Sequence, residues 1–224
     1  MLFEIKSFQD RIAHLYPKVM DLSLGRIKNL LKKLGNPQDS IERIIHVAGT
    51  NGKGSTLTYI SSILSASGYS VDSYTSPHLV HFNERIKIGR KGYQEDINDA
   101  ALEEILLQCE QVNDGDPITI FELITAAAFL KFSKTKSDFL ILETGLGGRL
   151  DATNVIQNPL VSVITPIGID HQQFLGDSIQ EIASEKAGII KDKCKTVLSY
   201  QDKSIIPIFQ DIINSRNNIS KIWN

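Results

Sequence analysis

The sequence predicts an α/β fold, in which helices flank a mostly parallel sheet and one strand leads into a phosphate-binding loop. Short apolar runs alternate along the chain with longer amphipathic segments, which is typical of a parallel sheet covered on both faces. A glycine-rich turn that contains a lysine stands between one apolar run and a helical pattern. Ligands of such sheets bind beyond the carboxyl ends of the strands, so the loops there are the candidate functional segments.

The apolar periodicity predicts five strands and five helices in alternation. The strands are expected at residues 43–48, 70–75, 138–143, 160–165 and 195–199. The helices are expected at residues 24–34, 53–67, 96–112, 120–133 and 178–190, and a further helix-like stretch covers residues 204–214.

Local signals add detail to this order of elements. Capping boxes, in which a hydroxyl and a carboxylate three residues later satisfy free backbone donors, predict two helix starts. They pair Thr119 with Glu122 and Ser178 with Glu181. Residues 76–93 read as a long loop with an irregular hairpin, and loops of that length in compact domains are often functional.

Length and charge restrict the class of protein. A chain of 224 residues suits one large domain, or one domain and the start of another. Its 24 Lys and Arg residues nearly balance its 26 Asp and Glu residues, so neither a nucleic acid nor an anionic membrane is expected as a partner. No apolar run approaches the roughly 18 residues that a membrane span needs.

Other features indicate a reducing cytoplasm. The first ten residues carry Glu4, Lys6 and Asp10 in place of a long apolar stretch, so no secretory signal is expected there. Cys109 and Cys194 are too few for a disulfide framework and lack metal-ligand spacing. Cys109 falls in a helical apolar pattern and is expected in the core.

The glycine-rich turn has the composition of an anion site. Residues 49–56 read Gly-Thr-Asn-Gly-Lys-Gly-Ser-Thr, and glycines allow backbone N–H groups to close around phosphates at a helix N-terminus. Val47 replaces the first glycine of the usual pattern, and Gly54 separates the lysine from Ser55. The alternative is an ordinary glycine turn with a surface lysine. The candidate nucleotide-binding residues are Gly49, Thr50, Asn51, Gly52, Lys53, Gly54 and Ser55.

This unusual loop resembles that of the folylpolyglutamate and dihydrofolate synthases, a family of the Mur ligase superfamily. The likeness continues in the same order through nearly everything from about residue 20 to 191. It includes residues 22–35, 74–79, 82–86, 119–122, 143–154, 168–171 and 182–189. The resemblance implies a fold like the Mur ligase central domain and one ATP-binding domain over residues 1–224. It also implies that a C-terminal ligase domain, present in the family, is missing from these 224 residues.

Two side chains near the loop are candidate ligands of a first magnesium ion. Glu143 ends a strongly apolar strand, so its carboxylate, a hard oxygen ligand, would lie beside the phosphate loop if this strand neighbours the strand at residues 43–48. The resemblance assigns Glu143 and Ser76 to this ion. The alternatives are a solvated glutamate at the end of a strand and a turn serine before Pro77.

The resemblance also implies a second magnesium site. His171 follows the strand at residues 160–165, although a histidine in a loop is more often structural or merely exposed. Lys186 matches a lysine that the family carbamylates, which converts an ammonium into an anionic metal ligand. The alternative is a surface lysine paired with Glu185 or Glu181.

The substrate end rests on the resemblance as well. The family places its pterin-bearing substrate near the segments that match residues 119–122 and 150–152. The candidate residues are Thr119, Ile120, Phe121, Glu122, Leu150, Asp151 and Ala152. Phe121 suits a flat ring as well as it suits the core, and Thr119 also caps a helix.

The implied activity is ATP- and Mg²⁺-dependent ligation of L-glutamate to dihydropteroate, to folates or to both, through an acyl phosphate. Lys53 and Lys186 are the expected catalytic lysines of a monomeric cytoplasmic enzyme, with ATP as co-substrate and two Mg²⁺ sites. One alternative is a Mur-type ligase of peptidoglycan precursors. Another is a non-catalytic nucleotide- or folate-binding remnant, because the family continues beyond the length of this chain.

Overall fold

The structure, a computed structural model, describes Phe8, Leu15 and residues 22–222. The opening segment, for which no secretory signal is expected, lies outside these residues except for Phe8. In the part of the chain that is described, helices flank a single eight-stranded sheet, as the sequence predicts.

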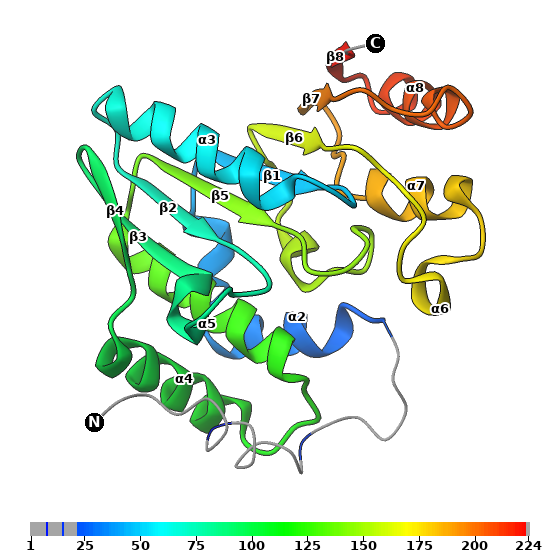
Figure 1. Cartoon of the computed structure of the whole chain (residues 1–224). Helices are drawn as coiled ribbons and strands as arrows, with labels where there is room; N and C mark the ends of the chain where they lie inside the picture. Colours follow the sequence, from blue (N-terminus) through cyan, green and yellow to red (C-terminus); the bar gives the residue numbers. More distant parts are fainter. Residues whose placement is uncertain (1–7, 9–14, 16–21, 223–224) are drawn as a thin grey trace.

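The sheet is parallel except at one edge, and its spatial order is β4-β3-β2-β5-β1-β6-β7-β8 (Figure 1). Strands β2, β5, β1, β6, β7 and β8 pair in parallel, whereas β3 and β4 form an antiparallel hairpin against β2. The strands are β1 Ile44–Ala48, β2 Val71–Tyr74, β3 Ile86–Arg90, β4 Tyr93–Asp96, β5 Phe139–Glu143, β6 Val161–Ile164, β7 Lys195–Leu198 and β8 Ile219–Ile222.

Strand β1 lies at the topological switch point of the sheet. After β1 the chain builds the β2 side, returns to β5 beside β1, and only then crosses to β6 on the other side of β1. A crevice forms at such a point, beyond the carboxyl ends of the strands. The loops after β1, β5 and β6 therefore meet there.

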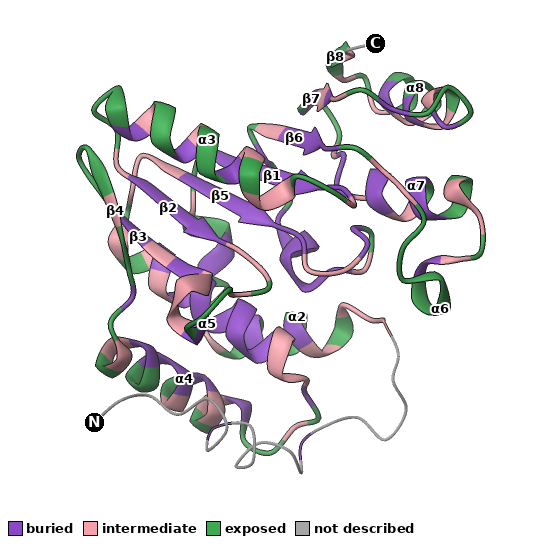
Figure 2. Cartoon of the chain, in the orientation of Figure 1, coloured by how far each residue is buried: buried purple, intermediate pink, exposed green. Residues whose placement is uncertain are grey.

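The described helices cover both faces of the sheet. They are α2 Gly25–Lys33, α3 Lys53–Ala66, α4 Asp99–Asn113, α5 Ile120–Thr135, α6 Gln172–Leu175, α7 Ile179–Ala187 and α8 Ile206–Ser215. Short 3₁₀ turns are η2 Pro37–Ser40, η3 Phe82–Arg85 and η4 Ala152–Val155. Figures 1 and 2 show α3 on one side of the sheet and α2, α4 and α5 on the other.

Burial divides the core into three apolar clusters. Leu57 of α3 packs with Val47, Ile141 and Val163 on one face of the sheet. On the opposite face, α2, α4 and α5 form one cluster, while α7 and α8 form another around Ala48. Helix α5 is apolar around nearly its whole circumference, as expected of a helix packed on all sides, and Figure 2 shows it largely buried.

The five predicted strands and five predicted helices are confirmed, most of them within one to three residues at each end. Both capping boxes are present, at Thr119 with Glu122 and at Ser178 with Glu181. Helix α4 begins three residues later than predicted because the Asn98 side chain accepts a hydrogen bond of 2.9 Å from the backbone N–H of Ala101 and so fixes its start. The predicted core position of Cys109 is also confirmed.

The prediction that the hairpin within residues 76–93 is irregular was wrong. The second half of this stretch forms a regular hairpin, in which β3 and β4 join across a turn at Lys91 and Gly92. Gly92 has a φ of 90°, a conformation that glycine adopts without strain. The alternation of Ile86 and Ile88 was the available signal, but Lys87, Gly89 and Arg90 dilute the apolar pattern.

Strand β8 was missed as well, since its residues are exposed at the sheet edge and carry little apolar pattern. Both described cysteines are unpaired and buried, in agreement with the absence of a disulfide framework. Among the described residues no helix is both long and apolar enough to cross a membrane.

We predict that Glu122→Ala destabilises the fold more than Glu181→Ala does. Both carboxylates close a capping box, but Glu122 is buried and also forms an ion pair of 3.0 Å with Arg26 of α2. Loss of a buried pair costs about 3 kcal/mol, well above the cost of an exposed cap. Urea unfolding of the two variants tests this, and equal losses would contradict it.

Candidate functional site

The loop after β1 is held against the end of β6. The backbone N–H groups of Thr50 and Asn51 both donate to the Pro166 carbonyl, at 3.0 and 3.1 Å. The Thr50 hydroxyl donates to the Gly168 carbonyl at 3.1 Å. A Cβ on Gly49 would lie 1.8 Å from Thr165 Oγ1, so only glycine allows the two loops to approach this closely.

The first turn of α3 points free donors out of this loop. Gly52, with a φ of 80°, caps the helix, and the first hydrogen bond inside it runs from Thr56 to the Gly52 carbonyl. Within the described structure the N–H groups of Lys53, Gly54 and Ser55 have no hydrogen-bond partner. Free amides at a helix N-terminus attract anions through their partial positive charge, so the geometry suits a phosphate group.

Two lysines meet at one carbonyl oxygen of the loop. Lys53 Nζ lies 3.2 Å from the Gly49 oxygen, and Lys186 Nζ, which comes from α7, donates to the same atom at 2.9 Å. Lys53 Nζ also donates to the Thr50 carbonyl at 3.3 Å, but carbonyl groups carry no net charge and cannot neutralise two ammonium groups. The pair therefore favours an anion beside the loop, or a loss of charge on one lysine.

Lys186 is the more buried of the two lysines. Burial and, to a smaller extent, the positive charge of Lys53 lower the pKa of Lys186 to about 8. The alternative partners considered for Lys186 are occupied elsewhere, since Glu185 pairs with Arg149 at 2.7 Å and Glu181 caps α7. The interpretation of Lys186 as a surface lysine was therefore wrong.

Glu143 lies at the end of β5, beside the first turn of α3. A Cβ on Gly54 would stand 3.8 Å from Glu143 Oε2. The carboxylate is buried and accepts hydrogen bonds from the Thr75 hydroxyl and, at 3.4 Å, from the Ser76 N–H. Burial raises its pKa, and the hydroxyl of Thr75 and the charge of Lys53 oppose that rise. Glu143 is thus not the solvated strand-end residue of the alternative interpretation.

Ser76 is placed next to Glu143 by the loop after β2. Its hydroxyl oxygen accepts a hydrogen bond of 3.2 Å from Arg85 Nη1. The Nε of Arg85 donates to His78 Nδ1 at 2.9 Å. Arg85 also stacks over the Phe82 ring, 5.3 Å from its centroid. The guanidinium therefore fixes the Ser76 oxygen within reach of the space beside Glu143.

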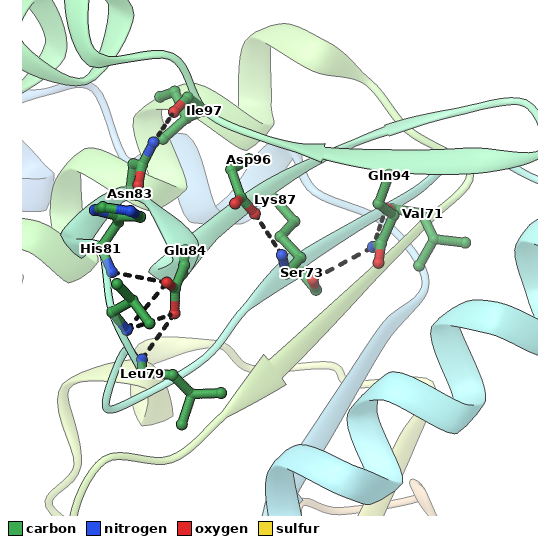
Figure 3. A network of polar contacts seen from close by, with 11 residues as sticks. Val71, Ser73, Leu79, His81, Asn83, Glu84, Lys87, Gln94, Asp96 and Ile97 are labelled. Carbon is green, nitrogen blue, oxygen red and sulfur yellow. Dashed lines mark hydrogen bonds and ion pairs between the residues drawn. The ribbon is translucent and has the colours of Figure 1, made fainter.

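The rest of this loop is tied down by one carboxylate. Glu84 accepts hydrogen bonds from the N–H groups of Leu79, Val80 and His81, at 2.7 to 3.3 Å, and Figure 3 shows its oxygens facing them. Asn83 Nδ2 donates to the Ile97 carbonyl at 3.1 Å, which joins the loop to the end of β4. Residues 76–85 are therefore an ordered wall of the site.

His171 lies in the loop between β6 and α6. It has a φ of 50° and caps the short helix α6. Its half-exposed ring lies 3.5 Å from Asp170 Oδ2, and this is its closest polar contact among the described residues. The described residues contain no group of three or more His, Cys, Asp and Glu side chains arranged to hold a metal.

The residues expected at the substrate end cluster behind the loop after β5. The Phe121 ring packs directly on Gly145, where a Cβ would lie 2.4 Å from the ring. Asp151 is buried, and its carboxylate accepts hydrogen bonds from the N–H groups of Gly145 and Leu146, at 2.9 and 2.8 Å. Ala152 is buried, whereas Ile120, Phe121 and Leu150 keep partly exposed surface.

The polar groups in this cluster already have protein partners. Thr119 and Glu122 bond to each other's backbone in the capping box, and Glu122 also binds Arg26. Several contacts that shape the site were not predicted, namely those made by Thr75, Arg85 and Thr165. Thr75 and Arg85 lie in the matched segments 74–79 and 82–86, but spacing along the sequence does not identify the atoms that these side chains contact.

The switch point at β1, the glycine-rich loop with its free helix N-terminus and the paired lysines define an α/β domain of the P-loop kind. A family model described as Mur ligase middle domain matches residues 47–222. This match covers most of the 224 residues, so the chain belongs to the Mur ligase middle-domain family.

Relatives and solved structures agree with this assignment. A dihydrofolate synthase/folylpolyglutamate synthase of Bacillus subtilis is 50% identical over 173 residues, or 75% of this chain and 40% of its own length. A dihydrofolate synthetase of Saccharomyces cerevisiae is 46% identical over 177 residues, or 77% of this chain and 40% of its own length. The structure of E. coli FolC in complex with DHPP and ADP is similar, with a TM-score of 0.87 at 32% identity.

The FolC match covers 97% of this chain and 51% of that chain. The chain therefore spans 40% of the length of the two curated relatives and about half of the solved structure. The mostly parallel sheet flanked by helices is the fold shared with these enzymes.

We predict that Lys53→Ala weakens Mg-ATP binding by about 1.5–3 kcal/mol, the usual value of a hydrogen bond to a charged group. Lys32→Ala is the matched control, because Lys32 lies on the exposed side of α2. Isothermal titration of both variants and the parent measures the difference. Equal affinity of the Lys53 variant and the parent would mean that this lysine does not contact the nucleotide.

Proposed function

We propose that this chain is the nucleotide-binding part of an ATP-dependent ligase that joins L-glutamate to dihydropteroate, to folates or to both. The observation that supports this most strongly is the free first turn of α3 beside Lys53, Lys186 and Glu143. The names of the relatives add the substrate class, because they are dihydrofolate and folylpolyglutamate synthases. FolC in complex with DHPP and ADP has the same fold.

The chemistry needs no nucleophilic side chain. A carboxylate oxygen of the pterin-bearing substrate attacks the γ-phosphorus of ATP, and ADP leaves, which gives an acyl phosphate. The amine of glutamate then attacks the acyl carbon, and the tetrahedral intermediate loses phosphate and a proton to form the amide. The α3 amides and Lys53 would hold the phosphates in place, since such transfer depends on positioning and charge stabilisation.

The residues around the phosphate position fit a magnesium ion. Mg²⁺ usually takes one or two protein oxygens together with phosphates and water, and it would neutralise phosphate charge here. Glu143 and Ser76 offer a buried carboxylate and a fixed hydroxyl beside the free amides. We propose that these two residues hold the first ion.

We also propose that Lys186 is carbamylated and, with His171, holds a second ion. Support comes from the burial of Lys186 beside the phosphate loop and from its position next to Lys53. A carbamate would replace the second positive charge at the Gly49 carbonyl with an anionic oxygen ligand. Residues 119–122 and 150–152 remain our proposal for the pterin-bearing substrate.

The rival proposals are less well supported. The names of the relatives favour a folate substrate over a peptidoglycan precursor. A binding protein without catalysis would not need Glu143 and Lys186 buried at the phosphate loop, yet both are there. We keep the proposal of a monomeric enzyme of the cytoplasm; the unpaired cysteines support a reducing compartment.

We predict that Lys186 forms a carbamate near neutral pH. After exposure of the protein to ¹³CO₂, ¹³C NMR should show a carbamate signal that is absent from Lys186→Ala. Lys53→Ala should retain the signal, because Lys53 is not the modified residue. A signal of equal size in Lys186→Ala, or no signal in the parent, would contradict the prediction.

We expect a polypeptide of these 224 residues to bind Mg-ATP but to ligate glutamate very slowly. The phosphate loop and the four proposed metal ligands lie within residues 49–186, so triphosphate binding can assemble. Ligation must also orient three substrates, and orientation is worth about 7–11 kcal/mol. The match spans only 40% of the length of the two curated relatives, and we propose that parts of them outside the match help to orient the substrates.

The assay supplies ATP, glutamate and either dihydropteroate or tetrahydrofolate, with and without the separately expressed C-terminal half of a relative. Activity that appears only with the added half supports the proposal. Near-normal ligation by the polypeptide alone would contradict the slow-turnover expectation. Failure to bind ATP, or no ligation of either substrate with the added half, would count against the proposed function.

A further inference from the structure

His46 is an unusual residue for the central strand of a buried sheet. It is fully buried in β1, three residues before the phosphate loop begins at Gly49. Two residues before it, Ile44 belongs to the apolar cluster of α2 and α5; two residues after it, Ala48 belongs to the cluster of α7 and α8. His46 therefore marks a polar boundary between two apolar clusters on one face of the sheet.

A chain of hydrogen bonds leads from His46 to the loop after β5. His46 Nε2 lies 2.8 Å from Thr153 Oγ1. Thr153 Oγ1 donates to Asp151 Oδ1 at 2.5 Å, and the Thr153 N–H donates to the same oxygen at 2.9 Å. The other oxygen, Oδ2, accepts from the N–H groups of Gly145 and Leu146.

The proton positions in this chain follow from the donors available. A threonine hydroxyl has one proton, and Thr153 donates it in the hydrogen bond to Asp151 Oδ1, because a short O–H···O bond of this kind favours a carboxylate acceptor. The hydroxyl oxygen must then accept from His46, so the imidazole carries its proton on Nε2. Nδ1 has no hydrogen-bond partner among the described residues, as an unprotonated acceptor would allow. Burial also lowers the pKa of His46 to about 3, which keeps the ring neutral.

The hydrogen-bond chain from His46 ends at Gly145 and Leu146, on the proposed substrate side of the site. Gly145 and Leu146 follow Glu143 by two and three residues, and Gly145 lies in direct contact with the Phe121 ring. A shift of Asp151 would move these amides and with them the surface on which Phe121 rests. The four hydrogen bonds that Asp151 accepts therefore set the shape of this wall.

We infer that His46 and Thr153 are positioning residues for the substrate: they orient Asp151, which holds the Gly145 and Leu146 amides and the packing of Gly145 on Phe121. This inference rests on the proposed function, because it takes Phe121 and residues 150–152 as the surface for the pterin-bearing substrate. Neither His46 nor Thr153 contacts the phosphate loop residues through a hydrogen bond. Their effect should therefore reach the substrate and spare the nucleotide.

The test compares Thr153→Val, which keeps the shape but removes the hydroxyl, with Thr153→Ser, which retains it. Pteroic acid and Mg-ADP are titrated separately into each full-length variant, and hydrogen exchange is followed at Gly145 and Leu146. For Thr153→Val we expect about tenfold weaker pteroic acid binding, the equivalent of one lost hydrogen bond, and an Mg-ADP affinity within about twofold of the parent. Exchange at Gly145 and Leu146 should accelerate relative to Ile141 of β5.

Thr153→Ser should retain both properties of the parent. His46→Gln, made in the parent, should retain most of them, because its amide can donate to the Thr153 hydroxyl. Equal weakening of both ligands, with faster exchange throughout the sheet, would show a purely structural role and overturn the inference. Unchanged exchange at Gly145 and Leu146 in Thr153→Val would overturn it too. If the parent binds Mg-ADP but not pteroic acid, the proposed substrate class fails, and the exchange rates alone decide whether His46 and Thr153 position the loop.

Discussion

The site depends on the close approach of Gly49 to Thr165. Because Gly49 has no side chain, the loop after β1 can lie on the end of β6, where the Pro166 carbonyl binds two of its amides. That contact uses the amides of Thr50 and Asn51 and leaves those of the first α3 turn free. It also directs the Gly49 carbonyl toward Lys53 and Lys186. The absence of a side chain at Gly49 thus determines which backbone amides stay free and which carbonyl the two lysines contact.

The functional groups of the candidate site meet because of the order of strands in the sheet, and not because of their order along the chain. Neighbouring strands β2, β5, β1 and β6 end at one edge, and the loop after each supplies a different part. The loop after β2 supplies a fixed hydroxyl at Ser76, and β5 ends in the buried carboxylate of Glu143. These groups are held by protein hydrogen bonds before any substrate arrives, which is the condition for electrostatic preorganisation.

The sequence predicted what is encoded locally. The phosphate loop, Lys53, the capping boxes and the five parallel strands each depend on residues within one short segment, so pattern and spacing were sufficient. The contact of Lys186 with the Gly49 carbonyl joins residues far apart in the chain. From the sequence alone Glu185 was an equally reasonable partner for Lys186, but Glu185 forms an ion pair with Arg149. The contact of Thr75 with Glu143 likewise joins distant residues, which are 68 residues apart. Arg85 and Ser76 are only nine residues apart, but their contact depends on how the loop between them folds. The hairpin of β3 and β4 was expected only as an irregular one, because the charged side chains of edge strands dilute the apolar pattern.

The position of β1 has a consequence for how the chain acquires its structure. Ile45 pairs with Ile141 on one side and with Val161 on the other, so the central strand has no sheet neighbour until segments nearly a hundred residues later are available. Pairings between such distant segments form slowly, because the intervening chain must first be brought together at a cost in entropy. During synthesis β1 emerges long before β5 and β6. Its apolar run therefore stays without these two neighbours until they have been synthesised, and the loop after β1 cannot bind the Pro166 carbonyl before then.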